Sequence, residues 1–236
     1  MAKNKFFQFK QFRVVQEKSA MKVGIDGVLL GAWADFDREQ RILDIGTGTG
    51  LLALMATQRT NAWVDSVEIE PEAAQEAEAN FRSSPWSGRL QLFVTAFQDF
   101  ETEKKYDHII SNPPFFEDSP KSNDGKRAKA RHADSLTLSD LLTKAVGVLE
   151  PHGRISMVFP SDKEERLRYL VRTLGLWVTK CARVFPDERK KSHRILVELS
   201  RDRQIDLIET IYIRRAETGE YTDQYRQLTK DFYLAF

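Results

Sequence analysis

The sequence predicts an α/β fold, a doubly wound and mostly parallel sheet of seven strands with an antiparallel edge strand. Apolar, strand-like runs alternate with helical patterns, which implies helices on both faces of the sheet. A glycine-rich turn joins the first of these strands to a helix, and the last two strands have no helix between them, as in a hairpin. The expected strands are residues 41–46, 63–69, 89–95, 106–112, 153–160, 177–185 and 194–201. The expected helices are residues 51–58, 71–83, 139–149 and 162–174, and residues 206–236 add one more apolar run and a closing helix.

Length and composition are those of one globular domain. The 236 residues suffice for a substantial core, and we expect a single domain over residues 1–236. Hydrophobic residues make up 41% and charged residues 30%, and the net charge of +1 favours no particular partner. The single cysteine, Cys181, excludes an internal disulfide. No stretch approaches the roughly 18 apolar residues of a membrane span, and the basic N-terminus lacks the apolar region of a signal peptide, so we expect a cytoplasmic protein.

The glycine-rich turn follows the first strand with an acid before its first glycine. Gly46 and Gly48 allow a ligand to approach the backbone closely at a helix N-terminus. Asp44 would repel a phosphate there but would attract an ammonium or sulfonium group. S-adenosylmethionine is such a ligand, although glycine turns also serve tight packing alone.

A second acid ends the next strand. Glu68 lies about 20 residues after the glycine turn, where an acid binds the ribose hydroxyls of a nucleotide. Glu70 is followed at once by Pro71 and fits the first turn of a helix. The alternative for both acids is that they only flank the start of the helix over residues 71–83. The glycine turn upstream favours Glu68 as a ribose ligand.

Residues 112–115 end the apolar run 106–111 with an amide, two prolines and an aromatic ring. Pro113 and Pro114 cannot continue a strand, so the chain leaves the sheet there. Ligands of open α/β sheets bind at the carboxyl ends of the strands. The Asn112 side-chain oxygen and the Pro113 carbonyl can accept hydrogen bonds from a planar amino group, on which the Phe115 ring can stack.

Residues 44–50, Glu68 and residues 112–115 together resemble the motifs of class I S-adenosylmethionine-dependent methyltransferases that methylate amino groups, which have a Rossmann-like fold. The resemblance extends to the bacterial tRNA (adenine-N6)-methyltransferases, which modify the base beside the anticodon of a valine tRNA. It spans nearly the whole chain. The segments that carry it are residues 9–12, 21–33, 84–86 and 228–234.

This resemblance implies a methyl transfer from S-adenosylmethionine to an adenine N6 in tRNA. It also implies that residues 1–38 form an extension facing cofactor and RNA, and that residues 39–236 form the catalytic core with a C-terminal helix. The catalytic residues would be Asn112, Pro113, Pro114 and Phe115. The cofactor would bind Lys22, Asp26, Asp44, Gly46, Thr47, Gly48, Glu68, Ile69, Ala96 and Phe97. Two departures stand out, because Ile25 replaces a threonine and Phe97 replaces an acid that reads the cofactor's adenine.

Positive charge gathers in three places, of which one is Lys3, Lys5, Lys10 and Arg13 near the N-terminus and two supply the candidate RNA-binding residues. Of these two clusters, the first follows residues 112–115 in a turn-rich stretch, and the second lies between the last two strands. Charge runs are most often solvated surface, but the first cluster lies close in sequence to the site, where RNA phosphates would pass. The candidate RNA-binding residues are Lys126, Arg127, Lys129, Arg131, Lys190, Lys191 and Arg194.

Other chemistries find little support. Cys181 lies in a strand-like run away from the motifs, which disfavours a cysteine nucleophile, and the four histidines lack metal-ligand spacing, so we expect no metal. The residues alone leave methylation of guanine N2, of a glutamine amide or of DNA adenine open. A non-catalytic RNA-binding module on the same scaffold is a further alternative.

Overall fold

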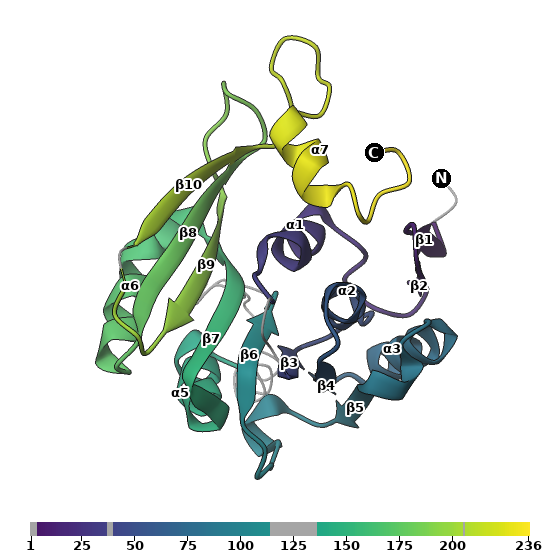
Figure 1. The fold of residues 1–236 in the computed structure, drawn as a ribbon, viewed down its shortest axis with the longest axis vertical. Helices are drawn as coiled ribbons and strands as arrows, with labels where there is room; N and C mark the ends of the chain where they lie inside the picture. Colours follow the sequence, from purple (N-terminus) through teal and green to yellow (C-terminus); the bar gives the residue numbers. More distant parts are fainter. Residues whose placement is uncertain (1–3, 37–39, 114–135, 205) are drawn as a thin grey trace, which may run out of the picture.

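A central eight-stranded sheet organises the molecule (Figure 1). The computed structural model describes residues 4–36, 40–113, 136–204 and 206–236. The strand order is β10-β8-β9-β7-β6-β3-β4-β5. The strands are β3 (Arg41–Ile45), β4 (Trp63–Glu68), β5 (Leu90–Val94), β6 (Tyr106–Ser111), β7 (Leu149–Pro160), β8 (Trp177–Phe185), β9 (Arg194–Ser200) and β10 (Leu207–Tyr212).

The predicted fold class is confirmed, with two differences in the sheet. The expected β8–β9 hairpin forms, but β9 runs antiparallel between β7 and β8 and is therefore an interior strand. β10 pairs parallel to β8 and becomes the edge. The apolar run predicted after residue 206 thus adds an eighth strand, which satisfies the backbone groups that β8 would otherwise expose.

Helices cover both faces of the sheet, as a doubly wound fold requires (Figure 1). One face carries α1 (Ile25–Trp33), α2 (Leu51–Arg59) and α3 (Pro71–Ser83), with α7 (Asp223–Thr229) beside α1. The other carries α5 (Leu138–Val148) and α6 (Glu164–Thr173). Successive residues of β3 serve the two apolar clusters alternately, Ile42 one and Leu43 the other, because side chains alternate along a strand. The short 3₁₀ helices are η1 (Ser87–Arg89), η2 (Phe97–Asp99) and η3 (Ser161–Lys163).

The N-terminal segment is fastened to α3 and to the C-terminal segment. A small hairpin of β1 (Phe6–Gln8) and β2 (Arg13–Val15) precedes α1, and Phe9 forms an isolated antiparallel bridge with Tyr233. Their rings stack at 6.0 Å between centroids. The two ends of the chain therefore lie on the same side of the molecule (Figure 1).

Candidate active site

Three sequence motifs meet at the carboxyl edge of the sheet. β6, β3 and β4 are parallel neighbours, so their last residues Ser111, Ile45 and Glu68 end at one edge. The Ser111 hydroxyl donates to the Ile45 carbonyl at 2.8 Å, which ties two of these strand ends together. The glycine turn, Glu68 and Asn112 are thus brought together as the sequence predicts.

The glycine turn needs its glycines for two different reasons. Gly46, Gly48 and Gly50 all have positive φ, at 70°, 56° and 82°. A Cβ on Gly50 would collide with the Phe81 ring, so Gly50 serves packing between the turn and α3. A Cβ on Gly46 or Gly48 would meet nothing within 4 Å, so the turn leaves open space on that side. A ligand can approach the backbone there.

Asp44 lies beneath the turn rather than at its mouth. Its side chain is fully buried, and one oxygen accepts hydrogen bonds from the Thr47 hydroxyl at 2.5 Å and the Ala53 N–H at 3.2 Å. Within the described parts of the chain, the other oxygen, Oδ1, is buried without a partner. Burial raises the pKa of Asp44 to about 7, against the opposing hydrogen bonds. A buried carboxylate with an unused oxygen suits a cationic ligand.

Glu68 is fixed to the turn by its own hydrogen bonds. Its carboxylate accepts the Gly48 N–H at 2.7 Å and the Glu70 N–H at 3.0 Å. Each carboxylate oxygen has a further lone pair with which to accept a ligand hydroxyl. Because the Gly48 N–H is already used by an acid, the turn is ill suited to a phosphate. Two carboxylates at one glycine turn fit a ribose and a positive charge.

Three of the predicted cofactor-binding residues, Ile69, Ala96 and Phe97, follow β4 and β5. The Thr95 N–H donates to the Glu68 carbonyl at 3.0 Å, which brings the neighbouring Ala96 to the same edge. Ile69 is exposed, with 48% of its surface accessible, and can present an apolar wall. Phe97, in contrast, is buried and stacks on Phe100 with ring centroids 6.4 Å apart. Its ring is engaged in the core, so Ile69 and Ala96 are the more accessible of the three.

Asn112 lies close to the N-terminal turn of α1. Asn112 and Pro113 are half-buried, and a Cβ built on Gly27 would lie 3.8 Å from the Asn112 amide nitrogen. The sequence pattern did not predict α1, although a signal exists. Gly27 and Gly31 lie one turn apart, and added Cβ atoms would meet Leu51 at 3.0 Å and Met55 at 2.6 Å. Glycines at that spacing mark a helix packed closely on a neighbour.

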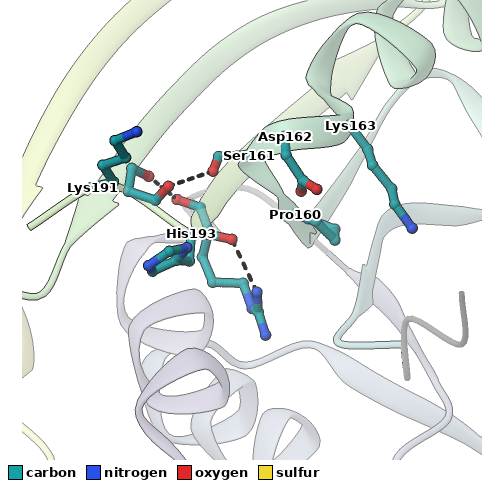
Figure 2. Close-up of a pocket in the computed structure, with 8 residues that line it drawn as sticks. Pro160, Ser161, Asp162, Lys163, Lys191 and His193 are labelled. Atoms are coloured by element: carbon teal, nitrogen blue, oxygen red, sulfur yellow. Dashed lines mark hydrogen bonds between the residues drawn. The ribbon is translucent and has the colours of Figure 1, made fainter.

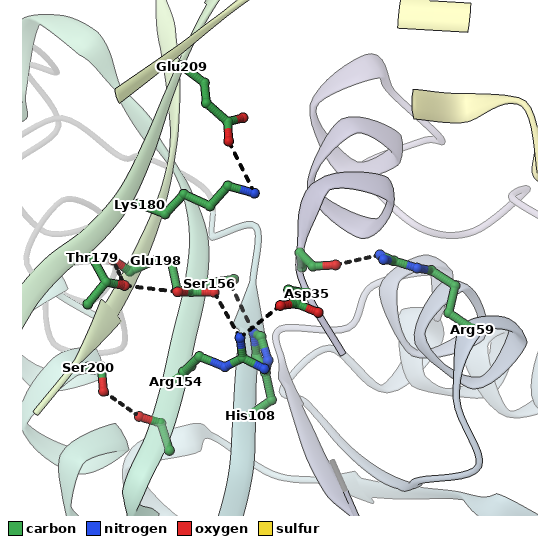
Figure 3. Close-up of polar contacts among 12 residues, drawn as sticks. Asp35, Arg59, His108, Arg154, Ser156, Thr179, Lys180, Glu198, Ser200 and Glu209 are labelled. Carbon is green, nitrogen blue, oxygen red and sulfur yellow. Dashed lines mark hydrogen bonds and ion pairs between the residues drawn. The ribbon is translucent and has the colours of Figure 1, made fainter. Parts of the chain in front are cut away.

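The C-terminal end of α1 is held by basic side chains (Figure 3). One Arg59 nitrogen donates to the carbonyls of Gly31, Ala32 and Ala34, satisfying groups that a helix end leaves open. Arg154 of β7 pairs with Asp35 at 3.2 Å, just after the helix. α1 is therefore fixed against both α2 and the sheet.

The N-terminal end of α1 is held by a pair that joins two predicted sites. Asp26, predicted to bind cofactor, forms an ion pair at 3.1 Å with Arg194, predicted to bind RNA. Lys22 is exposed and its amino group donates to the Asn4 carbonyl at 3.4 Å. Lys190 pairs with Asp187 at 3.1 Å, whereas Lys191 forms no ion pair with any residue that the structure describes. The remaining predicted site residues Pro114, Phe115, Lys126, Arg127, Lys129 and Arg131 lie outside the described residues.

A second network, missed from the sequence, joins α3 to the turn. Buried Asn80 bonds to the Val15 N–H and carbonyl at 2.8 and 2.9 Å, and donates to the Thr49 carbonyl at 2.9 Å. Glu76, one turn earlier, accepts the backbone N–H groups of residues 17, 18 and 19. Burial acts to raise the pKa of Glu76, but these hydrogen bonds prevail and lower it. α3 thereby connects the N-terminal segment to the glycine turn.

The doubly wound sheet and the acid–glycine turn at its carboxyl edge are the features of a class I S-adenosylmethionine-dependent methyltransferase. Residues 27–180 match the methyltransferase small domain family. The chain belongs to that family.

Relatives of known name match over nearly the full length. A protein of Parabacteroides distasonis named tRNA1(Val) (adenine(37)-N6)-methyltransferase is 42% identical over 233 residues, 98% of this chain and 98% of its own. One of Bacteroides fragilis with the same name is 41% identical over 232 residues, 97% of this chain and 98% of its own. A crystal structure from Agrobacterium tumefaciens, described as a predicted O-methyltransferase, superposes with a TM-score of 0.69 at 16% identity. It covers 88% of this chain and 96% of its own, and it supports the fold.

Metal-binding clusters and membrane-spanning helices are both absent from the described residues. No group of three or more His, Cys, Asp or Glu side chains within those ranges is placed to hold a metal ion. None of the helices in the same ranges is long and apolar enough to cross a membrane.

Proposed function

We propose that this enzyme transfers a methyl group from S-adenosylmethionine to N6 of adenine 37 in a valine tRNA. The observation that carries the proposal is the 42% identity, over 98% of both chains, to a protein named for that reaction. The presence of Asn112 at the carboxyl edge, beside the acid–glycine turn, supports it further.

On the cofactor side, we assign the methionine part to the glycine turn and the ribose to Glu68. S-adenosylmethionine supplies a methyl group on a positively charged sulfur. Asp44 has an unused buried oxygen that would be stabilised as a carboxylate by a cationic group nearby. Gly46, Thr47 and Gly48 offer backbone next to open space, and the Glu68 carboxylate has lone pairs left for ribose hydroxyls.

The adenine of the cofactor is assigned to the apolar surface of Ile69 and Ala96, with Phe97 beneath it. Lys22 and Asp26 belong to the N-terminal side of this site. With residues 1–38 as an extension facing the cofactor and RNA, the chain is one domain whose catalytic core spans residues 39–236. The pair between Asp26 and Arg194 makes positioning of α1 the primary contribution of Asp26.

On the substrate side, Asn112 is assigned to the reacting amino group. An exocyclic amine is a poor nucleophile because its lone pair is delocalised into the ring. The Asn112 side-chain oxygen and the Pro113 carbonyl would each accept one N–H bond and favour a pyramidal nitrogen. Phe115 would stack on the base, which is worth about 1–3 kcal/mol. No strong base is needed, because the nitrogen can lose its proton after attack.

The target base must leave its stack to reach Asn112. An RNA loop makes this inexpensive, since loop bases are already partly unstacked. The candidate RNA-binding residues Lys126, Arg127, Lys129, Arg131, Lys190, Lys191 and Arg194 are assigned to its backbone, with Lys190 and Arg194 exchanging acidic partners for phosphates. A tRNA substrate also supports a cytoplasmic location for the enzyme.

A labelled methyl-transfer assay tests this proposal against its alternatives. The enzyme would receive S-adenosylmethionine with a labelled methyl group and, separately, bulk tRNA, ribosomal RNA, duplex DNA or a protein extract. Label in tRNA alone is expected. Label confined to another polymer would identify that polymer, instead of tRNA, as the substrate. If the enzyme binds the cofactor but labels none of the polymers, a non-catalytic RNA-binding module would be favoured.

A further inference from the structure

A pocket of about 430 Å³ lies at the carboxyl end of β7, outside the residues assigned to the cofactor and to the target base (Figure 2). One side is formed by the end of β7 and by η3, and the other by the connection from β8 to β9. The residues that line it are Pro160, Ser161, Asp162, Lys163, Lys191, Ser192, His193 and Arg194. Figure 2 shows Asp162 and Lys163 on one side, with Lys191 and His193 on the other.

Hydrogen bonds join the two sides of the pocket. The Ser161 N–H donates to the His193 carbonyl at 3.3 Å, and the Ser161 hydroxyl donates to the Ser192 carbonyl at 2.7 Å. Pro160 and Arg194 are register partners at the start of the β7–β9 ladder. The side chains in the pocket are therefore carried by a rigid frame.

Two cations of this pocket differ from most of the neighbouring ones in having no acidic partner among the residues that the structure describes. Around it, Arg168 and Arg183 pair with Glu164 at 2.9 and 3.0 Å, and Lys190 pairs with Asp187. Lys163 and Lys191, in contrast, form no ion pair with any described residue.

Acidic charge does not cancel these two lysines. Arg194 is also in the lining, but its charge is met by Asp26 at 3.1 Å. Asp162 is the one acidic side chain among the lining residues that the structure describes. Positive charge therefore remains in excess, and the pocket suits an anion.

The pocket is within one nucleotide's reach of Asn112. Ser111 is the register partner of Met157, so Asn112 lies one residue and Pro160 three residues beyond that level on neighbouring strands. With about 3.3 Å of rise per residue and about 4.8 Å between strands, Pro160 and Asn112 are about 8 Å apart. A base held at Asn112 has its own or an adjacent phosphate at a comparable distance.

We propose that this pocket binds a phosphodiester group of the RNA strand next to the target nucleotide, with Lys163 and Lys191 as its cationic ligands. The inference rests on the proposed function, because it takes the base at Asn112 to belong to RNA. It adds Lys163 to the predicted RNA contacts. Lys191 has no ion pair to break among the described residues before it binds a phosphate, whereas Lys190 first has to leave Asp187. The pocket fixes the strand while the base is turned into the active site.

The test compares Lys163→Gln/Lys191→Gln with the parent and with Lys105→Gln as matched control, since Lys105 is exposed at the amino end of β6, on the opposite edge of the sheet. tRNA affinity is measured over a range of salt concentrations, methyl transfer by steady-state kinetics and S-adenosylmethionine affinity by calorimetry. We expect the double variant to bind tRNA on the order of tenfold more weakly at low salt. Its slope of log affinity against log salt should flatten by about 0.7 for each lysine that no longer neutralises a phosphate, or about 1.4 for the two. Its KM for tRNA should rise with kcat and cofactor affinity retained, and Lys105→Gln should change little.

Three results would overturn the pocket assignment: a parent-like salt slope in the double variant, an equal weakening in Lys105→Gln, or a loss of S-adenosylmethionine binding. The last would assign the lysines to the cofactor's carboxylate. Failure of the proposed function looks different, because the parent itself would then methylate no tRNA. Thermal melting of the variants confirms that each is folded.

Discussion

Asp44 shows how a single buried side chain can connect folding, protonation and ligand binding. Its pKa of about 7, against an ordinary 3.8, arises from burial at the end of β3. The carboxylate form is therefore disfavoured in the free enzyme, and a cationic ligand beside Oδ1 would restore it. The sequence places an acid there, but it does not show that α2 and the glycine turn enclose it.

We predict that cofactor affinity rises with pH through about 7, because the ionised form of Asp44 is the one that a sulfonium or ammonium favours. Calorimetry with S-adenosylmethionine from about pH 6 to about pH 8 should show proton release on binding. Asp44→Asn should bind about 1.5–3 kcal/mol more weakly and lose this pH dependence. Equal affinity of parent and variant across the range would remove Asp44 from the cofactor site.

The same shift predicts a stability profile in the absence of cofactor. Because the folded pKa is above the unfolded one, the contribution of Asp44 is fully present below pH 3.8 and is lost as pH rises to about 7. Denaturant titrations should show the free energy of unfolding of the parent falling relative to Asp44→Asn across that window. If the free energy of unfolding has the same pH profile in parent and variant, the pKa of Asp44 is not raised in the folded state.

At Asn112, chemistry can be separated from binding. We predict that Asn112→Ala abolishes turnover while retaining the fold and most tRNA affinity, since Asn112 is assigned to the reacting amino group alone. Asn61→Ala, an exposed asparagine before β4, is the control and should be fully active. Single-turnover rates decide the matter, and a near-normal rate in Asn112→Ala would exclude Asn112 as the acceptor.

At the scale of elements, two helices position the site: α1 lies close to Asn112, and α3 is bonded to the glycine turn. α3 reaches both the N-terminal segment and the glycine turn through Asn80. We predict that Asn80→Ala costs about 1–3 kcal/mol of stability, because it leaves the backbone groups of buried Thr49 and half-buried Val15 without their partner. Cofactor affinity should fall as well, because the turn loses its brace.

Ser83→Ala on the same helix is the matched control, since the Ser83 hydroxyl bonds only to the helix's own Asn80 carbonyl among the described residues. Chemical denaturation and calorimetry on both variants measure the two effects. Loss of stability without any loss of cofactor affinity would mean that the N-terminal segment and the turn are not coupled.

The sequence predicted elements where patterns are regular and failed where burial is uniform. β3 to β9 follow from apolar runs and their punctuation, and the motifs converge because parallel strands end at one edge. α1 was not predicted because residues 27–33 are all buried, so the helix has no polar face from which its 3.6-residue period could be recognised. The Asp26–Arg194 pair joins residues 168 positions apart, which no local pattern reveals.

For the whole molecule, RNA binding is expected to be a matter of distributed charge. The net charge is only +1, so affinity must come from local clusters. We predict that neutralising Lys126, Arg127, Lys129 and Arg131 flattens the salt slope by roughly 0.7–0.9 for each phosphate that is no longer neutralised, and leaves cofactor binding unchanged. Filter binding at several salt concentrations measures it. An unchanged slope would direct attention to the pocket lysines Lys163 and Lys191.

The most direct test of the account is to map the methylated nucleotide. A valine tRNA would be incubated with the enzyme and S-adenosylmethionine, digested with nuclease and analysed by mass spectrometry, with Asn112→Ala in parallel. We predict one N6-methyladenine, at position 37, with the parent and none with the variant. A methyl group on any other base or atom, or the same product from Asn112→Ala, would contradict the account.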